Sequence, residues 1–280
     1  MSARQKSSQP QSQSAAGQRP VALITGASSG IGEALAHCFA AAGHDLLLVA
    51  RSADTLARLA ATLQKKYAIA AQAMPADLSQ AGAVEQLAAQ VQQRCVPDVL
   101  VNCAGLMEQT HFVQMAPAAH QAMIDVNISA LTAMLAHLLP GMVQRGSGRV
   151  LNVASVAAFQ PIPMMATYAA SKAYVLSLTE ALSEELRGSG VTASALCPGI
   201  TATPMLQSAT QSNQSLSNLP AFVVGDVAVV ARQGFEACMQ GRVICVPGAV
   251  NQAANWASRS TPRTLLRRVM GWAASSRYGG

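Results

Sequence analysis

The segment Val21-Ala-Leu-Ile-Thr-Gly-Ala-Ser-Ser-Gly-Ile-Gly32 joins a short apolar run to a glycine-rich turn. An apolar run of this length, bounded by turn residues, is typical of a buried strand. An alanine-rich segment follows the turn, continues to Ala42 and stops at Gly43, which is typical of a helix. A strand, a turn and a helix in direct succession predict the first unit of an α/β sheet.

The rest of the chain repeats this alternation. Further strands are expected at residues 46–50, 69–74, 99–102, 149–154, 191–196 and 242–246, and helices at 52–67, 80–94, 117–143, 168–187 and 225–239. Strands separated by helices imply right-handed crossovers and a parallel sheet. The predicted fold class is therefore α/β: a single Rossmann-type, doubly wound parallel sheet of about seven strands with helices on both faces.

Composition sets the expected domain organisation. A chain of 280 residues with 51% hydrophobic content can build one large domain, which we place at residues 20–250. Residues 1–19 are rich in Gln and Ser and contain no apolar core, so they are expected to be a disordered tail rather than a secretory signal. Residues 251–280 are expected to be a basic extension that is helical in part.

Membrane-spanning segments are not expected, because residues such as His137 and Pro140 interrupt every apolar run before it reaches the ~18 residues that a spanning helix needs. We therefore expect a soluble, cytoplasmic protein. The six cysteines and five histidines are scattered without metal-ligand spacing. The cysteines are expected to be free thiols in a reducing compartment, and no metal site is expected.

The net charge of +6 comes from the two ends of the chain. Residues 1–20 contain three basic residues and residues 251–280 contain five arginines, with no acid in either segment, whereas the middle carries 11 basic and 13 acidic residues. A nucleic-acid-binding domain usually shows a basic stripe across its body. Nucleic acid is therefore not an expected partner.

The glycine turn has the context of a dinucleotide-binding fingerprint, between a strand and a helix. Gly26, Gly30 and Gly32 permit positive φ angles and close approach of the backbone, so a pyrophosphate can reach the free N–H groups of the helix N-terminus. Ser28 and Ser29 add hydroxyl donors. Because the spacing is GxxxGxG rather than GxGxxG, a turn that serves only tight packing is the alternative interpretation.

A second informative segment extends from Val150 to Lys172. It contains an apolar strand that ends at Ser155, a loop broken by prolines, and a helical pattern in which Tyr168 and Lys172 share a face because they are four residues apart. A free phenol titrates near ~10, and a neighbouring cation lowers that pKa. Ser155 falls at the carboxyl end of a strand, where open α/β sheets bind ligands. Taken alone, a Tyr–Lys pair at this spacing is more often an exposed surface pair than a catalytic one.

Together with Asp77-Leu78, Asn102-Cys-Ala-Gly105, Asn127 and Pro198-Gly-Ile-Thr-Ala-Thr203, these motifs resemble the classical short-chain dehydrogenases/reductases in order and spacing, over about residues 19–248. The resemblance implies a nicotinamide-dependent oxidoreductase that transfers a hydride between its cofactor and the carbonyl or alcohol of a small molecule. One departure is Cys103, which stands where the family usually has a second asparagine.

The resemblance also implies residue roles. Tyr168 would be the general acid/base, Lys172 would lower the phenol pKa and hold the nicotinamide ribose, and Ser155 would orient the carbonyl. Asn127 would support a proton relay through water. Without the resemblance, it would be interpreted as a buried polar residue of the core. The implied cofactor-binding residues are Gly26, Ser28, Ser29, Gly30, Ile31, Gly32, Arg51, Asp77, Leu78, Asn102, Ala104, Gly105, Tyr168, Lys172, Thr201 and Thr203.

Arg51 indicates which cofactor is used. In dinucleotide-binding folds an acid after the second strand binds the ribose 2′-hydroxyl, whereas an arginine accommodates a 2′-phosphate. Arg51 occupies this position, and no acid follows until Asp54. NADP(H) is therefore favoured; NAD(H) is the alternative, if Arg51 only stacks on the adenine.

Substrate information is limited to two apolar segments. The loop from Ile200 to Phe222 places Ser and Gln between apolar residues, which suits a mobile lid. Phe159, Ile162, Met164 and Met165 add apolar surface before Tyr168. These features favour an apolar ketone or aldehyde, such as a ketoacyl or steroid-like compound. The ending from Val246 to Asn251 resembles a subgroup of these reductases that includes long-chain ketoacyl and hydroxysteroid enzymes.

Two other classes of function are considered. A cofactor-binding regulatory protein would be free to lose Ser155, Tyr168 or Lys172, yet all three are present. A membrane-surface protein is suggested by residues 263–272, in which Leu265, Val269 and Trp272 share one face of a basic helix. Packing of that helix on its own fold or on a second subunit is favoured instead, and a homo-oligomer is expected.

Overall fold

The computed structural model describes residues 19–203, 224–262, 264–268 and 270–271. The strands are β1 (Val21–Thr25), β2 (Asp45–Ala50), β3 (Ala71–Pro75), β4 (Val99–Asn102), β5 (Gly148–Val153), β6 (Val191–Leu196) and β7 (Ile244–Cys245). The helices are α1 (Gly30–Ala41), α2 (Ala53–Tyr67), α3 (Ala83–Gln92), α4 (Pro117–Ile124), α5 (Leu131–Arg145), α6 (Ala166–Glu185), α8 (Val227–Met239) and α9 (Ala249–Ser260). Shorter helical segments are η1 (Phe112–Gln114), η2 (Asp125–Ala130) and η3 (Val156–Phe159).

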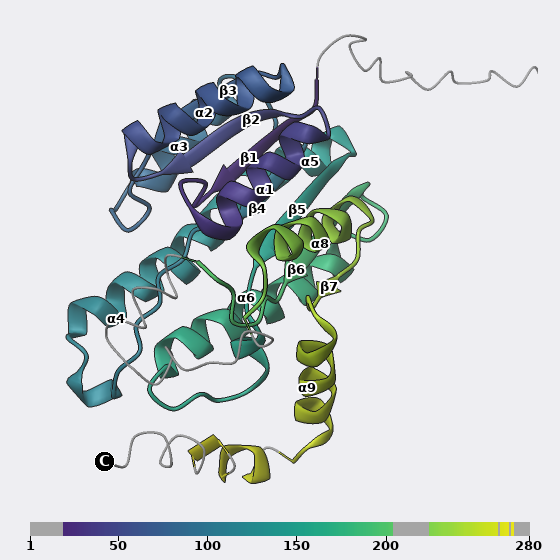
Figure 1. The fold of residues 1–280 in the computed structure, drawn as a ribbon. Helices are drawn as coiled ribbons and strands as arrows, with labels where there is room; N and C mark the ends of the chain where they lie inside the picture. The colour runs from purple at the N-terminus through teal and green to yellow at the C-terminus, as the bar shows by residue number, and fades with distance from the viewer. Residues whose placement is uncertain (1–18, 204–223, 263, 269, 272–280) are drawn as a thin grey trace, which may run out of the picture.

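The described strands form a seven-stranded sheet in the order β3-β2-β1-β4-β5-β6-β7 (Figure 1). Every pairing of neighbouring strands is parallel. The order reverses between β1 and β4, and in open α/β sheets the crevice at such a point is where ligands bind. The predicted fold class is confirmed, and with it the placement of all strand carboxyl ends at one edge.

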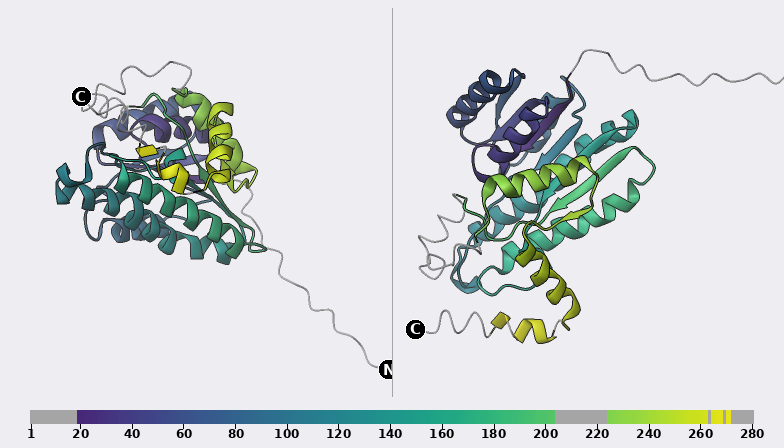
Figure 2. Two further views of the ribbon diagram at one scale, coloured as in Figure 1. Left: turned by 90° about the horizontal axis from the view of Figure 1, so that it is seen from below. Right: turned by 45° about the vertical axis from the view of Figure 1, so that its right-hand side comes forward.

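Helices cover both faces of the sheet because side chains alternate along each strand. On β1, Ala22 and Ile24 belong to the core beneath α1, α2 and α8, whereas Leu23 belongs to the core beneath α3, α5 and α6. The views of Figure 2 show the same two layers of helices on either side of the sheet. The two apolar cores hold the strand carboxyl ends in fixed register.

Most element boundaries differ from expectation by only a few residues. The largest difference concerns the helix expected at 117–143, which is a continuous run of α4, the π-helical segment η2 and α5. By length and composition alone, the described run Pro117–Arg145 is apolar enough to cross a membrane. No such segment was expected, because His137 and Pro140 interrupt the apolar run, yet these two residues barely lower its mean hydropathy. In the fold, α5 packs against α3, and α4 packs against α6.

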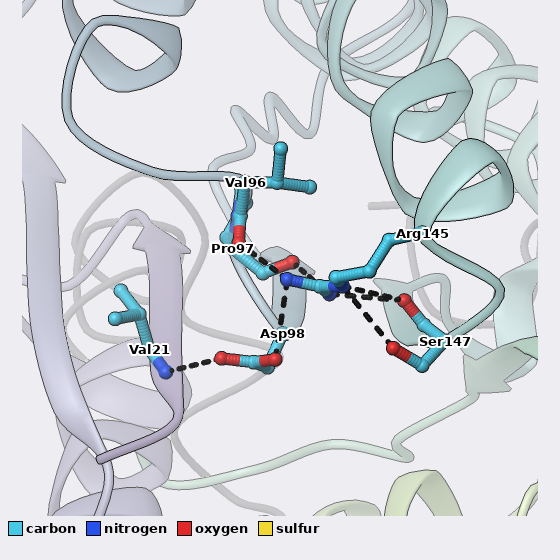
Figure 3. Close-up of polar contacts among 6 residues, drawn as sticks. All are labelled: Val21, Val96, Pro97, Asp98, Arg145 and Ser147. Carbon is cyan, nitrogen blue, oxygen red and sulfur yellow. Dashed lines mark hydrogen bonds and ion pairs between the residues drawn. The ribbon is translucent and has the colours of Figure 1, made fainter. Parts of the chain in front are cut away.

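A polar cluster joins the amino ends of three central strands (Figure 3). The Arg145 guanidinium donates to the carbonyl oxygens of Val96 at 2.6 Å and Pro97 at 2.9 Å, and it also donates to Ser147. It forms an ion pair with Asp98 at 3.3 Å, and Asp98 in turn accepts from the backbone N–H of Val21 at 2.8 Å. This cluster fixes β1, β4 and β5 at the edge of the sheet away from their carboxyl ends.

Replacing Arg145 with methionine is expected to lower the free energy of unfolding by about 2–3 kcal/mol, because loop carbonyls and Asp98 lose a charged donor. Arg187→Met is the matched control, since Arg187 pairs with Glu184 and both side chains are mostly exposed. The control should change stability by less than about 0.5 kcal/mol. Urea unfolding of both variants measures the difference, and equal midpoints would contradict a stabilising role for the cluster.

Candidate active site

A cleft of about 640 Å³ opens at the carboxyl edge of the sheet. Its volume lies within the range usual for small-molecule and cofactor sites. Two predicted residues, Asn102 and Asn127, do not line it. The predicted residues that line it are Gly26, Ser28, Ser29, Gly30, Ile31, Gly32, Arg51, Asp77, Leu78, Ala104, Gly105, Ser155, Tyr168, Lys172, Thr201 and Thr203.

The glycine turn after β1 is shaped by close backbone contacts. Gly26 has φ +68°, and a Cβ on it would lie 2.8 Å from the backbone nitrogen of Ala104. A Cβ on Gly32 would lie 2.1 Å from the carbonyl oxygen of Gly26. Only glycine fits at these two positions, so the turn folds tightly against both its own helix and the loop after β4.

Helix α1 begins in this turn, and its first N–H groups are suited to bind an anion. Ser29 is the N-cap residue, yet its side chain makes no capping hydrogen bond. The first N–H groups of a helix have no partner within the helix and, with the helix dipole, favour a negative charge. These features fit a cofactor pyrophosphate.

Thr25 connects the glycine turn to the loop after β4. Its hydroxyl oxygen accepts from the backbone N–H groups of Cys103 at 3.0 Å and Ala104 at 3.1 Å, and its hydroxyl donates to the carbonyl of Val101 at 3.3 Å. Cys103, the one departure from the family pattern, lies within this turn and donates its backbone N–H to Thr25. Burial raises the pKa of Cys103 to about 12, so it stays a neutral thiol.

Ser155, Tyr168 and Lys172 meet where β5 and α6 face the cleft. Ser155 follows β5 and caps η3, with its hydroxyl oxygen accepting from the N–H of Ala157 at 3.1 Å. The Tyr168 phenol is hydrogen-bonded to Ser155. The Lys172 ammonium donates to the carbonyl of Val153 at 2.9 Å and lies 5.8 Å from the centre of the Tyr168 ring. The structure therefore brings the three side chains together.

The pKa values of this group differ from the sequence-based expectation. Lys172 was expected to lower the pKa of Tyr168, but burial raises the pKa of this phenol and outweighs its hydrogen bond with Ser155. Burial also lowers the pKa of Lys172 to about 8. Desolvation disfavours a charge on either side chain, and this effect dominates because both lie deep in the cleft floor. Tyr168 is consequently a neutral phenol at neutral pH.

Asn127 lies behind the cleft rather than in its wall. It belongs to the π-helical segment η2, a rare local geometry that often marks functional sites. Its side chain accepts from the N–H of Leu106 at 2.8 Å, and it donates to the Leu106 carbonyl at 2.9 Å and to the Ser171 hydroxyl at 3.0 Å. Ser171 donates in turn to the carbonyl of Tyr168 at 2.7 Å. Asn127 therefore connects the loop after β4 to the helix that carries Tyr168.

The expected contact between Asn102 and the cofactor is not supported, because its side chain turns away from the cleft. Its amide donates to Asn152 on the neighbouring strand β5 at 2.9 Å, and the Asn152 amide donates to Thr179 on α6 at 3.0 Å. All three residues are buried. An asparagine at the end of a strand can contact a ligand or bond to a neighbouring strand. The sequence did not distinguish these two roles, because the choice depends on which strand pairs with β4.

Arg51 and Asp77 line the cleft at the carboxyl ends of β2 and β3. Asp77 accepts from the hydroxyl of Ser79 at 2.7 Å and from its backbone N–H at 3.1 Å, and these hydrogen bonds lower the pKa of Asp77. Arg51 adds a smaller effect in the same direction. Arg51 is exposed, so its guanidinium is available to an anion.

Several residues that line the cleft were not predicted from the sequence. Local patterns did not indicate Met107, Gln109, Pro163 or Met270, and Met270 lies a hundred residues beyond Tyr168 in the chain. Ser171, between Tyr168 and Lys172, was also missed. Residues 204–222, most of the lid expected at 200–222, lie outside the described residues, and so do Val269 and Trp272 of the expected membrane-surface face.

The sheet topology and the position of the cleft define the class of fold: a doubly wound α/β sheet of the dinucleotide-binding type. The family model for short chain dehydrogenases matches residues 20–214. The chain belongs to this family.

Similar proteins agree with this assignment. The chain is 34% identical to a 2-(R)-hydroxypropyl-CoM dehydrogenase of Xanthobacter autotrophicus, over 75% of this chain and 88% of the relative. Among solved structures, it is similar to a short-chain dehydrogenase from Sphingobium yanoikuyae in complex with NADPH, with a TM-score of 0.77 and 32% identity over 87% of this chain and 96% of that one. It is also similar to a bulky-bulky ketone specific alcohol dehydrogenase from Comamonas testosteroni, with a TM-score of 0.73 and 28% identity over 87% and 95% of the two chains.

Proposed function

We propose that this protein is an NADP(H)-dependent oxidoreductase that interconverts the carbonyl and alcohol forms of a small, mainly apolar substrate. The observation that carries the proposal is the Tyr168 phenol in the cleft, hydrogen-bonded to Ser155 and backed by Lys172. A binding protein would have no use for a buried acid of this kind beside a hydroxyl donor. Perturbed titratable groups in a cleft are typical of catalytic sites.

The residues of the cleft can donate a proton to the substrate and can stabilise the negative charge that develops on it. The bound cofactor supplies the hydride. As negative charge develops on the substrate oxygen, Tyr168 donates its phenolic proton and Ser155 donates a hydrogen bond to the same atom. Lys172 is cationic below a pH of about 8 and stabilises the phenolate that remains. Asn127 and Ser171 have a positioning role, because their hydrogen bonds hold α6 against the loop after β4.

The substrate class follows from the remaining lining residues. Apart from the polar Gln109 and Gln160, the part of the cleft near Tyr168 is lined by apolar side chains: Leu106, Met107, Ile162, Pro163 and Met165. Such a surface favours an apolar ketone over a sugar, because buried sugar hydroxyls would lack partners. The similarity to a dehydrogenase specific for bulky-bulky ketones supports the same class. Screening ketones of graded size with NADPH, by the absorbance of the reduced cofactor, tests the proposal; no turnover of any ketone or alcohol would contradict it.

The preference for NADP(H) rests on Arg51, and the NADPH complex of the Sphingobium protein supports it. A charge-assisted hydrogen bond to phosphate contributes about 1.5–3 kcal/mol, which corresponds to roughly tenfold or greater discrimination. The unmodified protein should bind NADPH at least ~10-fold more tightly than NADH, and Arg51→Asp should reverse the order by adding repulsion. Fluorescence titration with each reduced cofactor measures both ratios.

Arg58→Asp is the matched control for this prediction, since it makes the same charge change on the exposed surface of the following helix α2. The control should keep the preference for NADPH. A tighter complex with NADH in the unmodified protein would exclude NADP(H) as the preferred cofactor. An equal shift in the two variants would mean that net charge, rather than contact with Arg51, sets the preference.

A further inference from the structure

The chain beyond the sheet returns to the cleft. After β7, α9 leaves the sheet and is followed by a helical turn at 264–268. Seen from below in the left panel of Figure 2, these yellow segments lie in front of the carboxyl edge of the sheet. Met270, just after the turn, lines the same cleft as Tyr168. The family match ends at residue 214, so this segment is outside the part of the chain that matches the family model.

The start of this segment is fixed against the catalytic loops. Asn251 fills the space beside Gly199, where a Cβ would lie 2.4 Å from its amide nitrogen, and it donates to the carbonyl of Pro247 at 2.8 Å. Gln252 donates to the carbonyl of Val246 at 3.0 Å. Helix α9 also packs against η3, the turn that Ser155 caps. The segment therefore lies beside Ser155, at the opposite end of the cleft from the glycine turn.

One face of the terminal turn is covered and the other is exposed. Leu266 and Met270 are four residues apart, so they share a face of the helix, and both are half-buried. Leu265, Arg267 and Arg268 are exposed. Because Met270 lines the cleft, the covered face is the one turned toward it. A methionine is unbranched and polarisable, so it can close a cavity against ligands of related shape.

We propose that the described residues 264–268 and 270–271 cap the substrate end of the cleft and that Met270 limits the size of the ketone that the cleft accepts. This inference rests on the proposed function and adds the residue that determines specificity. Met270 is not a catalytic residue, because its thioether takes no part in the transfer of hydride or proton. It acts by occupying volume that a larger substituent on the carbonyl would need.

Specificity across a graded series of aryl alkyl ketones tests the role of Met270. With NADPH as cofactor, Met270→Ala should raise kcat/KM for the bulkiest ketones at least ~10-fold relative to the smallest, and Met270→Trp should lower the same ratio by a similar factor. Leu265→Ala is the matched control, because Leu265 is 53% exposed on the other side of the turn. It should leave the ratio unchanged. Uniform changes across the series in both Met270 variants would overturn the proposal.

A second measurement separates failure of the cap from failure of the proposed function. Oxidation of Met270 by dilute hydrogen peroxide, followed by mass spectrometry in the full-length protein, needs no turnover. If Met270 packs against the cleft as proposed, its sulfoxide should form at least ~5-fold more slowly than that of free methionine, because a half-buried sulfur is shielded from the peroxide. Oxidation at the rate of free methionine would overturn the cap. Slow oxidation in a protein that reduces no ketone would instead leave the cap standing and remove the proposed activity.

Discussion

Tyr168→Phe is expected to lower turnover by at least ~10²-fold and to leave the affinity for NADPH within about threefold of its original value. The substitution keeps the ring, which packs in a small apolar cluster with Met123, Ala157 and Ala169, and removes only the phenolic oxygen. The loss should therefore fall on kcat rather than on folding or cofactor binding. Steady-state kinetics and a fluorescence titration with NADPH measure the two effects.

Tyr174→Phe is the matched control, on the same helix. The Tyr174 hydroxyl shares a hydrogen bond of 2.9 Å with Thr132 and is partly exposed, away from the cleft. Its removal should leave kcat within about twofold, as is usual for surface changes. Near-normal turnover in Tyr168→Phe would remove this phenol from the mechanism, whereas equal losses in both variants would point to damage to α6.

Gly32→Ala is expected to lower both the stability and the cofactor affinity. Its Cβ would lie 2.1 Å from the carbonyl oxygen of Gly26 and 2.7 Å from the carbonyl carbon, so the backbone of the turn must move. Overpacking of this kind should lower the free energy of unfolding by about 3 kcal/mol and weaken NADPH binding ~10²-fold or more. Urea unfolding and cofactor titration measure the two losses.

Gly141→Ala provides the comparison for this prediction. Gly141 lies within α5, and the atoms nearest to a Cβ there would belong to the Val96 side chain, whose methyl groups lie at 3.3 Å. Val96 is partly exposed and can move, and alanine favours the helix by up to about 1 kcal/mol, so the change in stability should stay within about 1 kcal/mol. A Gly32→Ala protein that matches the Gly141→Ala protein in stability and NADPH affinity would show that the turn can relax at little cost.

The fold also holds the proposed catalytic side chains in fixed positions. Tyr168, Ser155 and Lys172 come from the end of a central strand and the first turns of a long helix, rather than from mobile loops. At the other edge of the sheet, the Arg145 cluster fixes the starts of β1, β4 and β5. The amino ends of these strands are therefore constrained by residues outside the site.

The amino-acid sequence by itself determined the local parts of this protein. The alternating apolar runs predicted a parallel sheet with its strand carboxyl ends at one edge, and the glycine spacing predicted the tight turn before α1. The interval between Tyr168 and Lys172 placed both side chains on one face of α6. These inferences succeed because they depend on steric limits and on helical or strand periodicity between residues that are close in the chain.

The tertiary structure decided the features that depend on distant residues. Asn102, expected to contact the cofactor, bonds to Asn152, and Asn127, expected to support a proton relay, bonds to Ser171; neither lines the cleft. Burial raises the pKa of Tyr168 although Lys172 lies beside it. Met270 reaches the cleft only because α9 packs on η3. Burial and side-chain partners are set by which elements pack together across the fold, and no local pattern encodes that packing.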